Sequence, residues 1–267
     1  MENFKRINIG NSQIIVDNFS FEKNQEIRDF IKNTKFIEEM LEKINSQIYI
    51  ILGGDGTMLR AINSTAEDKI PYLGINFGTK GFLLNDKNYL GGDSFVSKKY
   101  PLLDINVKTE KLEFFDRAFN EAQIKAGGGT MIDLDLKIGE NSNINLRGDG
   151  LLIVTPAGST GYNLSASGPI LPHDSNTFIA TPLLVFEPKG VRPVVFPNNM
   201  DVKIIKNNER KPKMSVYADS KEIIADYEGE AEIIIKKSSQ EVELLIAKSY
   251  EKSWNNKIYS EQGFNIS

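Results

Sequence analysis

The apolar run Ile48–Leu52 ends abruptly at the motif Gly53-Gly54-Asp55-Gly56-Thr57. The run is rich in β-branched residues, which is typical of a strand buried on both faces of a parallel sheet. The segment Met58–Ile62 then starts a helix, and residues 71–76 have the pattern of a second strand. A strand, a glycine turn, a helix and another strand in this order predict an α/β region with parallel strands.

Apolar periodicity divides the chain into two parts. Over residues 22–45 the apolar positions recur every three or four residues, which predicts a helix. From about residue 100 they alternate instead, as in residues 134–138, and two further strands are expected at 233–235 and 242–246. We therefore predict an N-terminal Rossmann-like α/β domain and a C-terminal, mostly β, β-sandwich-like domain. Their expected limits are 1–98 and 99–247, with a tail, 248–267, that packs back on the first domain.

Composition excludes several kinds of site and partner. The 267 residues include no cysteine and one histidine, so disulfide frameworks, thiolate sites and multi-histidine metal sites are ruled out. A net charge of −4 disfavours nucleic acid, because binding to its phosphates needs a basic surface. No apolar run reaches the roughly 18 residues of a membrane span, and the first residues lack a signal-peptide pattern. We expect a cytoplasmic protein with no membrane or nucleic-acid partner.

The first glycine motif is suited to phosphate chemistry. Its glycines let the backbone turn sharply and approach a ligand, and the helix start behind them offers unpaired N–H groups to an anion. Asp55 is the ionisable residue of the motif and could accept a hydroxyl proton or hold a divalent cation. The spacing differs from that of the P-loop and of the dinucleotide fingerprint. The motif alone also allows a tight turn in which Asp55 caps the helix.

A second stretch, Arg147–Pro169, joins an apolar strand to a loop crowded with glycine and hydroxyl residues. Such a loop presents hydroxyls and backbone amides at close range and suits a phosphate or a nucleoside. The stretch also resembles the long diagnostic motif of NAD kinases. Together with Gly53–Thr57, the pair Asn120-Glu121 and the segment Leu73–Leu83, it makes the chain resemble this family over roughly residues 48–197.

This resemblance implies a reaction and a set of site residues. The chain would be a kinase that phosphorylates the 2′-hydroxyl of the adenosine ribose of NAD, in NADP biosynthesis, with Asp55 as the catalytic residue. The phosphate or donor loop would comprise Gly53, Gly54, Gly56 and Thr57. The NAD-binding residues would be Asn120, Glu121, Asp149, Thr160, Gly161, Tyr162 and Ser165.

The same resemblance implies cofactors and partners. ATP or polyphosphate would donate the phosphoryl group, and a divalent cation, Mg²⁺, would be bridged by phosphates near Asp55 with no protein ligand assigned. The expected assembly is a homodimer or homotetramer. Lys80, Lys189 and Arg192 are candidates for additional cations at the phosphates, although each could equally be a solvated surface charge.

The chain departs from the family pattern at several places. Ala157 and Gly161 stand where the family commonly has Thr and Ala, the stretch Thr181–Pro193 lacks the usual Pro-His-Ser, and Val216–Ser220 only approximates an Asp-Gly step. These departures keep open a non-catalytic NAD(P)-binding regulatory protein. Lipid and sphingoid-base kinases share the Gly-Gly-Asp-Gly-Thr loop and are a second alternative, which the Asn120-Glu121 pair disfavours.

Overall fold

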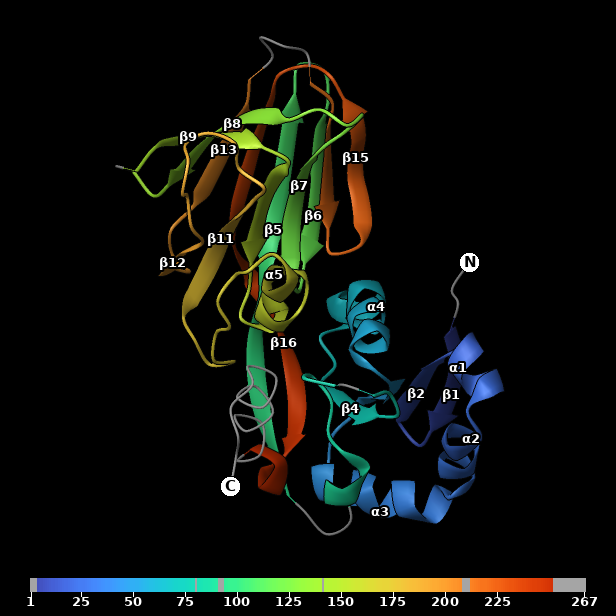
Figure 1. The fold of residues 1–267 in the computed structure, drawn as a ribbon. Coiled ribbons are helices and arrows are strands. Elements are labelled where there is room, and N and C mark those ends of the chain that lie inside the picture. The colour runs from blue at the N-terminus through green and yellow to red at the C-terminus, as the bar shows by residue number, and fades with distance from the viewer. Residues whose placement is uncertain (1–3, 80, 91–93, 141, 208–211, 252–267) are drawn as a thin grey trace. The chain divides into compact units, whose positions relative to one another are not determined.

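The computed structural model describes residues 4–79, 81–90, 94–140, 142–207 and 212–251, and it divides into two compact units (Figure 1). The first unit comprises Met1–Lys99 and Val242–Ser267, and the second comprises Tyr100–Glu241. Both boundaries fall inside strands, namely β5 (Phe95–Thr109) and β16 (Ala231–Ala247). Continuous strands therefore join the units. Most of the predicted tail, from residue 252 on, lies outside the described residues.

A largely parallel sheet forms the centre of the first unit. Its strands are β1 (Phe4–Ile9), β2 (Ser12–Asp17), β3 (Tyr49–Gly53) and β4 (Tyr72–Asn76). The pair β1–β2 is an antiparallel hairpin, whereas β2, β3 and β4 run parallel to one another. The end of β16 continues the sheet, with Leu244 opposite Tyr72 in parallel register. The α/β character predicted for this region is confirmed.

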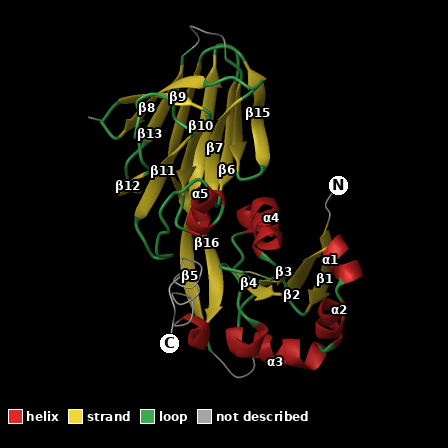
Figure 2. Cartoon of the chain, in the orientation of Figure 1, coloured by secondary structure: helices red, strands yellow, loops and turns green. Residues whose placement is uncertain are grey.

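Helices cover both faces of this sheet (Figure 2). They are α1 (Asn18–Lys23), α2 (Gln25–Lys32), α3 (Thr34–Ile44) and α4 (Asp55–Thr65), with short 3₁₀ turns at Ala66–Asp68 and Lys87–Tyr89. Ile27, Ile37 and Met40 pack against the side chains of one sheet face. On the other face, a Cβ on Gly74 of β4 would lie 2.6 Å from Met58 Cε, so α4 rests directly on the strand backbone.

The helical character predicted for residues 22–45 is confirmed, although the helix is not continuous. The segment forms three helices because two asparagines interrupt it. The Asn24 side chain accepts hydrogen bonds from the N–H groups of Glu26 and Ile27, and the Asn33 side chain accepts one from Phe36. An asparagine that satisfies the free N–H groups at a helix start favours a new helix there over continuation of the previous one.

The second unit is a β-sandwich. One sheet has the order β12-β11-β10-β7-β14-β15 and is antiparallel throughout. The other contains β5, β6, β8, β9, β13 and the first part of β16. The remaining bounds are Glu113–Ala118 for β6, Glu121–Ala126 for β7, Ile132–Ile138 for β8, Ile144–Gly148 for β9, Gly150–Val154 for β10, Thr177–Leu183 for β11, Val194–Pro197 for β12, Val202–Lys206 for β13, Met214–Ala218 for β14 and Lys221–Tyr227 for β15.

One hydrophobic core fills the space between these sheets. It contains buried side chains from both, such as Ile124 and Val216 from one sheet and Ile204 and Ile233 from the other. The mostly β class predicted for this region is confirmed. A 3₁₀ turn, Ala157–Thr160, and a short helix, α5 (Tyr162–Ser165), follow β10.

The two strands expected at 233–235 and 242–246 are one strand, β16. Buried positions alternate up to Ile235, and the alternation resumes in the opposite phase after the exposed pair Lys236-Lys237. The change of phase made one strand look like two. No helix among the described residues is both long and apolar enough to cross a membrane.

Candidate active site

The first glycine motif forms the turn between β3 and α4. The Gly54 carbonyl accepts the N–H groups of Thr57 and Met58 at 2.9 and 3.1 Å, so the helix begins at Asp55, earlier than the Met58 start we predicted. A Cβ on Gly53 would lie 2.6 Å from Thr57 Oγ1. Thr57, in the first turn of α4, thus packs tightly against Gly53. A side chain at position 53 would have no room, so glycine is required there.

The carboxylate of Asp55 is held by the loop that follows β4. Its Oδ2 accepts the N–H of Phe82 and its Oδ1 accepts the N–H of Leu83, both at 2.9 Å. Gly54 is the N-cap of α4, and no side-chain capping hydrogen bond is found within the described part of the chain. Asp55 is therefore not the helix cap that the motif alone allowed. Two backbone donors fix its orientation, and the positive end of the α4 dipole favours its charge.

A cavity of about 540 Å³ lies beside this turn. It is lined by Phe19, Ser20, Lys23, Asn24, Gln25, Glu26, Ile27, Gly53, Gly54, Phe77 and Gly78. These residues follow the carboxyl ends of β2, β3 and β4 or belong to the helices that come next. Ligands of open α/β sheets bind at this edge, outside the carboxyl ends of the strands.

In the second unit, Phe119 and Asn120 form the tight connection between β6 and β7, and Glu121 is the first residue of β7. The Asn120 carbonyl accepts the N–H of Thr155 at 2.9 Å, and the Thr155 hydroxyl donates to the Phe119 carbonyl at 2.6 Å. A Cβ on Gly158 would lie 2.3 Å from the Asn120 carbonyl oxygen. The glycine and hydroxyl residues after β10 therefore pack against the backbone of this pair.

Each residue of the Asn120-Glu121 pair has one side-chain oxygen without a partner among the described residues. Asn120 Oδ1 and Glu121 Oε2 are buried, and neither has a hydrogen-bond partner among the described residues. Burial, reinforced by the carboxylate of Asp219, raises the pKa of Glu121 to about 7; a hydrogen bond from Gln123 and the charge of Lys125 oppose this shift. Buried polar atoms are nearly always paired, so two unpaired oxygens on neighbouring residues are candidates for contact with a ligand.

A second cavity, of about 630 Å³, contains three of the other predicted residues. It is lined by Lys125, Ala126, Gly129, Thr130, Asp149, Tyr162, Ser165, Ala166, Ser167, Pro182, Leu183 and Leu184. Asp149 precedes β10, and its carbonyl accepts the N–H of Ala126 at 2.8 Å. A carboxylate, hydroxyls and an aromatic ring thus line one cavity, which is the kind of lining that small-molecule sites have.

The structure groups the predicted site residues within each unit. Asp55 and the glycine turn belong to the first unit. In the second unit Asp149, Tyr162 and Ser165 share the larger cavity, whose described lining does not include Asn120, Glu121, Thr160 or Gly161. Gly161 instead faces the pair, because a Cβ there would lie 3.8 Å from Asn120 Nδ2.

Sequence reasoning missed two charged residues of the second unit. Lys125 is the one cation among the described residues that line the larger cavity, and its ammonium lies 4.6 Å from the Tyr162 ring centroid. The alternation of Glu121, Gln123 and Lys125 along β7 could have indicated that they share a face. Lys189 and Arg192 are absent from the described lining of both cavities, and Lys80 lies outside the described residues. The second charged residue that sequence reasoning missed is Asp219, which lies in the turn between β14 and β15.

Comparisons with known proteins identify relatives of both regions. Residues 9–86 match the ATP-NAD kinase N-terminal domain, and residues 119–247 match the ATP-NAD kinase C-terminal domain. An NAD kinase of Colwellia psychrerythraea is 32% identical over 232 residues, which cover 80% of this chain and 78% of the relative.

Two solved structures share the fold. A yeast NADH kinase complexed with NADH has a TM-score of 0.70 and 22% identity, over 82% of this chain and 67% of that one. An Archaeoglobus fulgidus NAD kinase in complex with ATP has a TM-score of 0.63 and 24% identity, over 85% of this chain and 94% of that one.

Proposed function

The chain belongs to the NAD kinase family, and we infer from this that it transfers the γ-phosphoryl group of ATP to the 2′-hydroxyl of the adenosine ribose of NAD, which yields NADP. It is an enzyme, a phosphotransferase with an alcohol acceptor. Matches to both kinase domains in order along one chain carry this conclusion. They do not favour the lipid or sphingoid-base kinase or the non-catalytic binding protein.

Asp55 is our candidate for the general base. Its carboxylate would accept the proton of the ribose 2′-hydroxyl as that oxygen bonds to the γ-phosphorus of ATP, while the bond from that phosphorus to the β–γ bridging oxygen breaks and ADP leaves. The two N–H groups that hold the carboxylate, from Phe82 and Leu83, support this role. They keep the acceptor oxygens in a defined position.

A divalent cation fits this site only as a companion of the donor phosphates. Among the described residues, no group of three or more metal-ligating side chains is gathered in one place. Mg²⁺ commonly takes one or two carboxylates together with substrate phosphates, and Asp55 is suited to be that carboxylate. When bound, the cation would neutralise the negative charge of the phosphates.

The second unit is our candidate for dinucleotide recognition. Asn120 and Glu121 offer unpaired oxygens to ribose hydroxyls, and Asp149, Tyr162 and Ser165 offer a carboxylate, a ring and a hydroxyl within one cavity. Thr160 and Gly161 directly precede Tyr162 in the chain, and Gly161 also faces the side chain of Asn120. The cation of Lys125 complements the negative charge of a dinucleotide.

The decisive experiment replaces Asp55 by Asn. We expect Asp55→Asn to lower kcat by roughly 100- to 10,000-fold, the range of a lost general base, while NAD binding measured by calorimetry is retained. NADP is measured with an NADP-specific dehydrogenase after incubation with NAD, ATP and Mg²⁺. Asp29→Asn, on the exposed face of α2, is the matched control. Turnover of Asp55→Asn close to that of the wild type would exclude Asp55 as the base. Replacing ATP by polyphosphate tests the second donor.

We also propose a cytoplasmic enzyme, since ATP and NAD are available there, and a homodimer or homotetramer. Exposed apolar side chains on and near the edge strand β12, namely Leu184, Phe186, Val194 and Val195, support self-association. Light scattering coupled to gel filtration measures the mass directly, and a monomer at micromolar concentration would contradict this assembly.

A further inference from the structure

The turn between β14 and β15 carries a buried carboxylate. Asp219 is 1% exposed, and its backbone φ is 53°, in the left-handed region that few residues other than glycine adopt. Ser220, which stands at the glycine of the family's Asp-Gly step, has no positive φ. The unusual conformation is therefore placed on Asp219 itself, and aspartate is among the residues that tolerate it best.

This carboxylate binds the backbone of the recognition pair. Asp219 Oδ2 accepts the N–H of Phe119 at 3.0 Å, and Oδ1 accepts those of Asn120 and Glu121 at 2.8 and 3.1 Å. In return, the Asp219 N–H donates to the Glu121 carbonyl at 2.9 Å. Hydrogen bonds to a charged acceptor are about twice as strong as neutral ones, and here three converge on one group.

These bonds matter because few side-chain contacts orient the pair. Asn120 Oδ1 and Glu121 Oε2 have no partner within the described part of the chain, and Glu121 Oε1 accepts a hydrogen bond from Gln123 Nε2 at 3.0 Å, so the backbone largely sets the direction in which the two unpaired oxygens point. Thr155 and Gly158 hold that backbone from the β10 side. Asp219 holds it from the β14–β15 side.

We propose that Asp219 is a positioning residue for the dinucleotide: its carboxylate fixes the backbone from Phe119 to Glu121, so that the side-chain oxygens of Asn120 and Glu121 meet the substrate already oriented. This role rests on the proposed function of the pair. Asp219 itself does not contact the substrate. Loss of the Asp219 carboxylate should therefore weaken the affinity for NAD and leave the ATP site and the overall fold intact.

The charge of Asp219 supplies an independent readout. The charged groups that face Glu121 are Asp219, from the β14–β15 turn, and Lys125, on the same strand; Gln123 adds a neutral hydrogen bond. Asp219 raises the pKa of Glu121, whereas the other two lower it. Removing the Asp219 charge should therefore move the titration of Glu121 to lower pH.

The test is Asp219→Asn in the full-length protein. Asparagine tolerates a positive φ, but its amide group cannot accept the third N–H, and the charge is lost. We expect KM for NAD to rise by roughly tenfold to a hundredfold, the equivalent of a lost charge-assisted interaction, with KM for ATP changed less than about twofold. We also expect the Glu121 midpoint, followed by NMR with labelled glutamate, to fall.

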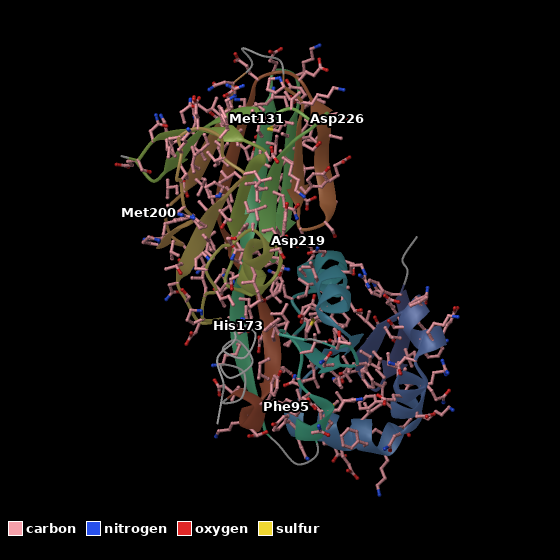
Figure 3. The ribbon with its side chains drawn as sticks, in the orientation of Figure 1. Phe95, Met131, His173, Met200, Asp219 and Asp226 are labelled. Atoms are coloured by element: carbon pink, nitrogen blue, oxygen red, sulfur yellow. The ribbon has the colours of Figure 1, made fainter. Side chains whose placement is uncertain are left out.

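Asp226→Asn is the matched control, because Asp226 also has a positive φ, of 45°, but is exposed. Figure 3 shows it at the opposite end of the second unit from Asp219. It should leave both KM values and the Glu121 midpoint unchanged.

Three outcomes would overturn the proposal. The first is an Asp219→Asn protein whose KM for NAD stays within about twofold of the wild type. The second is an equal rise of KM for NAD and for ATP. If Asp219→Asn does not fold, Asp219→Gly keeps the positive φ without strain; should that variant fail to fold as well, Asp219 is a structural residue. A wild-type protein that makes no NADP would instead refute the function on which the proposal rests.

Discussion

The glycine turn before α4 and the Asn120–Glu121 turn hold their functional groups in opposite ways. In the first, the side chain of Asp55 is itself fixed, by two backbone N–H groups. In the second, the backbone is fixed, and one side-chain oxygen of each residue remains unpaired among the described residues. The difference fits the two proposed roles, because a general base must be held in place throughout, whereas a recognition group must keep free lone pairs for its ligand.

Glycines also serve the two turns differently. A Cβ on Gly158 would overlap the backbone oxygen of Asn120, whereas the nearest atom to a Cβ on Gly56 would be Arg60 Nη1, at 3.5 Å. Gly158 is thus required by the fold. Gly56 has open space beside it within the protein, and a ligand can approach there. Substitutions of Gly158, Glu121 and Gly56 test how the two turns differ.

The largest effect is expected for Gly158→Ala. Because the added methyl group would meet a backbone atom that cannot move independently, we expect the free energy of unfolding to fall by about 3 kcal/mol. Urea unfolding followed by circular dichroism measures it. A loss below about 1 kcal/mol would mean that the Asn120 turn can shift, and that it is less rigidly held than we conclude.

Glu121→Gln tests the buried carboxyl group of Glu121 through the pH dependence of stability. Folding raises the pKa of Glu121 from 4.5 to about 7, so the folded state favours the protonated acid. The stability that this group contributes is fully present below pH 4.5 and is lost as the pH rises through about 7. Glutamine cannot ionise. As the pH rises from 4.5 to above 7, the free energy of unfolding of the variant should therefore increase relative to that of the wild type by up to about 3 kcal/mol.

Urea unfolding at pH 5 and pH 8 compares the two proteins. If the difference between their free energies of unfolding is the same at both pH values, the pKa of Glu121 is not raised by folding. Its surroundings would then not be those of a buried, unpaired acid.

The smallest effect on stability is expected for Gly56→Ala. Alanine favours the helix that Gly56 occupies in α4, so the free energy of unfolding should rise by up to about 1 kcal/mol. We expect NADP formation to fall nevertheless, since the methyl group would stand where a phosphate approaches the turn. Full activity together with the higher stability would show that this glycine is not reserved for a ligand.

Local patterns predicted the elements that carry the chemistry. The apolar run Ile48–Leu52 and residues 71–76 correspond to β3 and β4, and the turn between β3 and α4 lies where the glycines indicated. These signals are short-range, because a buried strand and a tight turn each depend on neighbouring residues. The same locality made residues 22–45 look like one helix, since periodicity does not register two capping asparagines.

Asp219 could not be found in this way. Its partners lie about a hundred positions earlier in the chain, with separations of 98 to 100 residues. Only the pairing of β14 with β7 brings them together. A single aspartate before a serine carries no sign of such a bond. The roles of the other site residues remain predictions, and the substitutions above address those of Asp55, Gly56 and Glu121.

The order of the units along the chain has a consequence for how the protein is made. The second unit is one continuous segment, whereas the first is interrupted and needs Val242–Ser267 to be complete. On the ribosome, the β-sandwich can therefore finish folding while the α/β unit still waits for the last part of β16. Until Leu244 emerges and pairs with Tyr72, β4 is an uncovered edge of apolar residues, the kind of surface that chaperones bind and that aggregates when they do not.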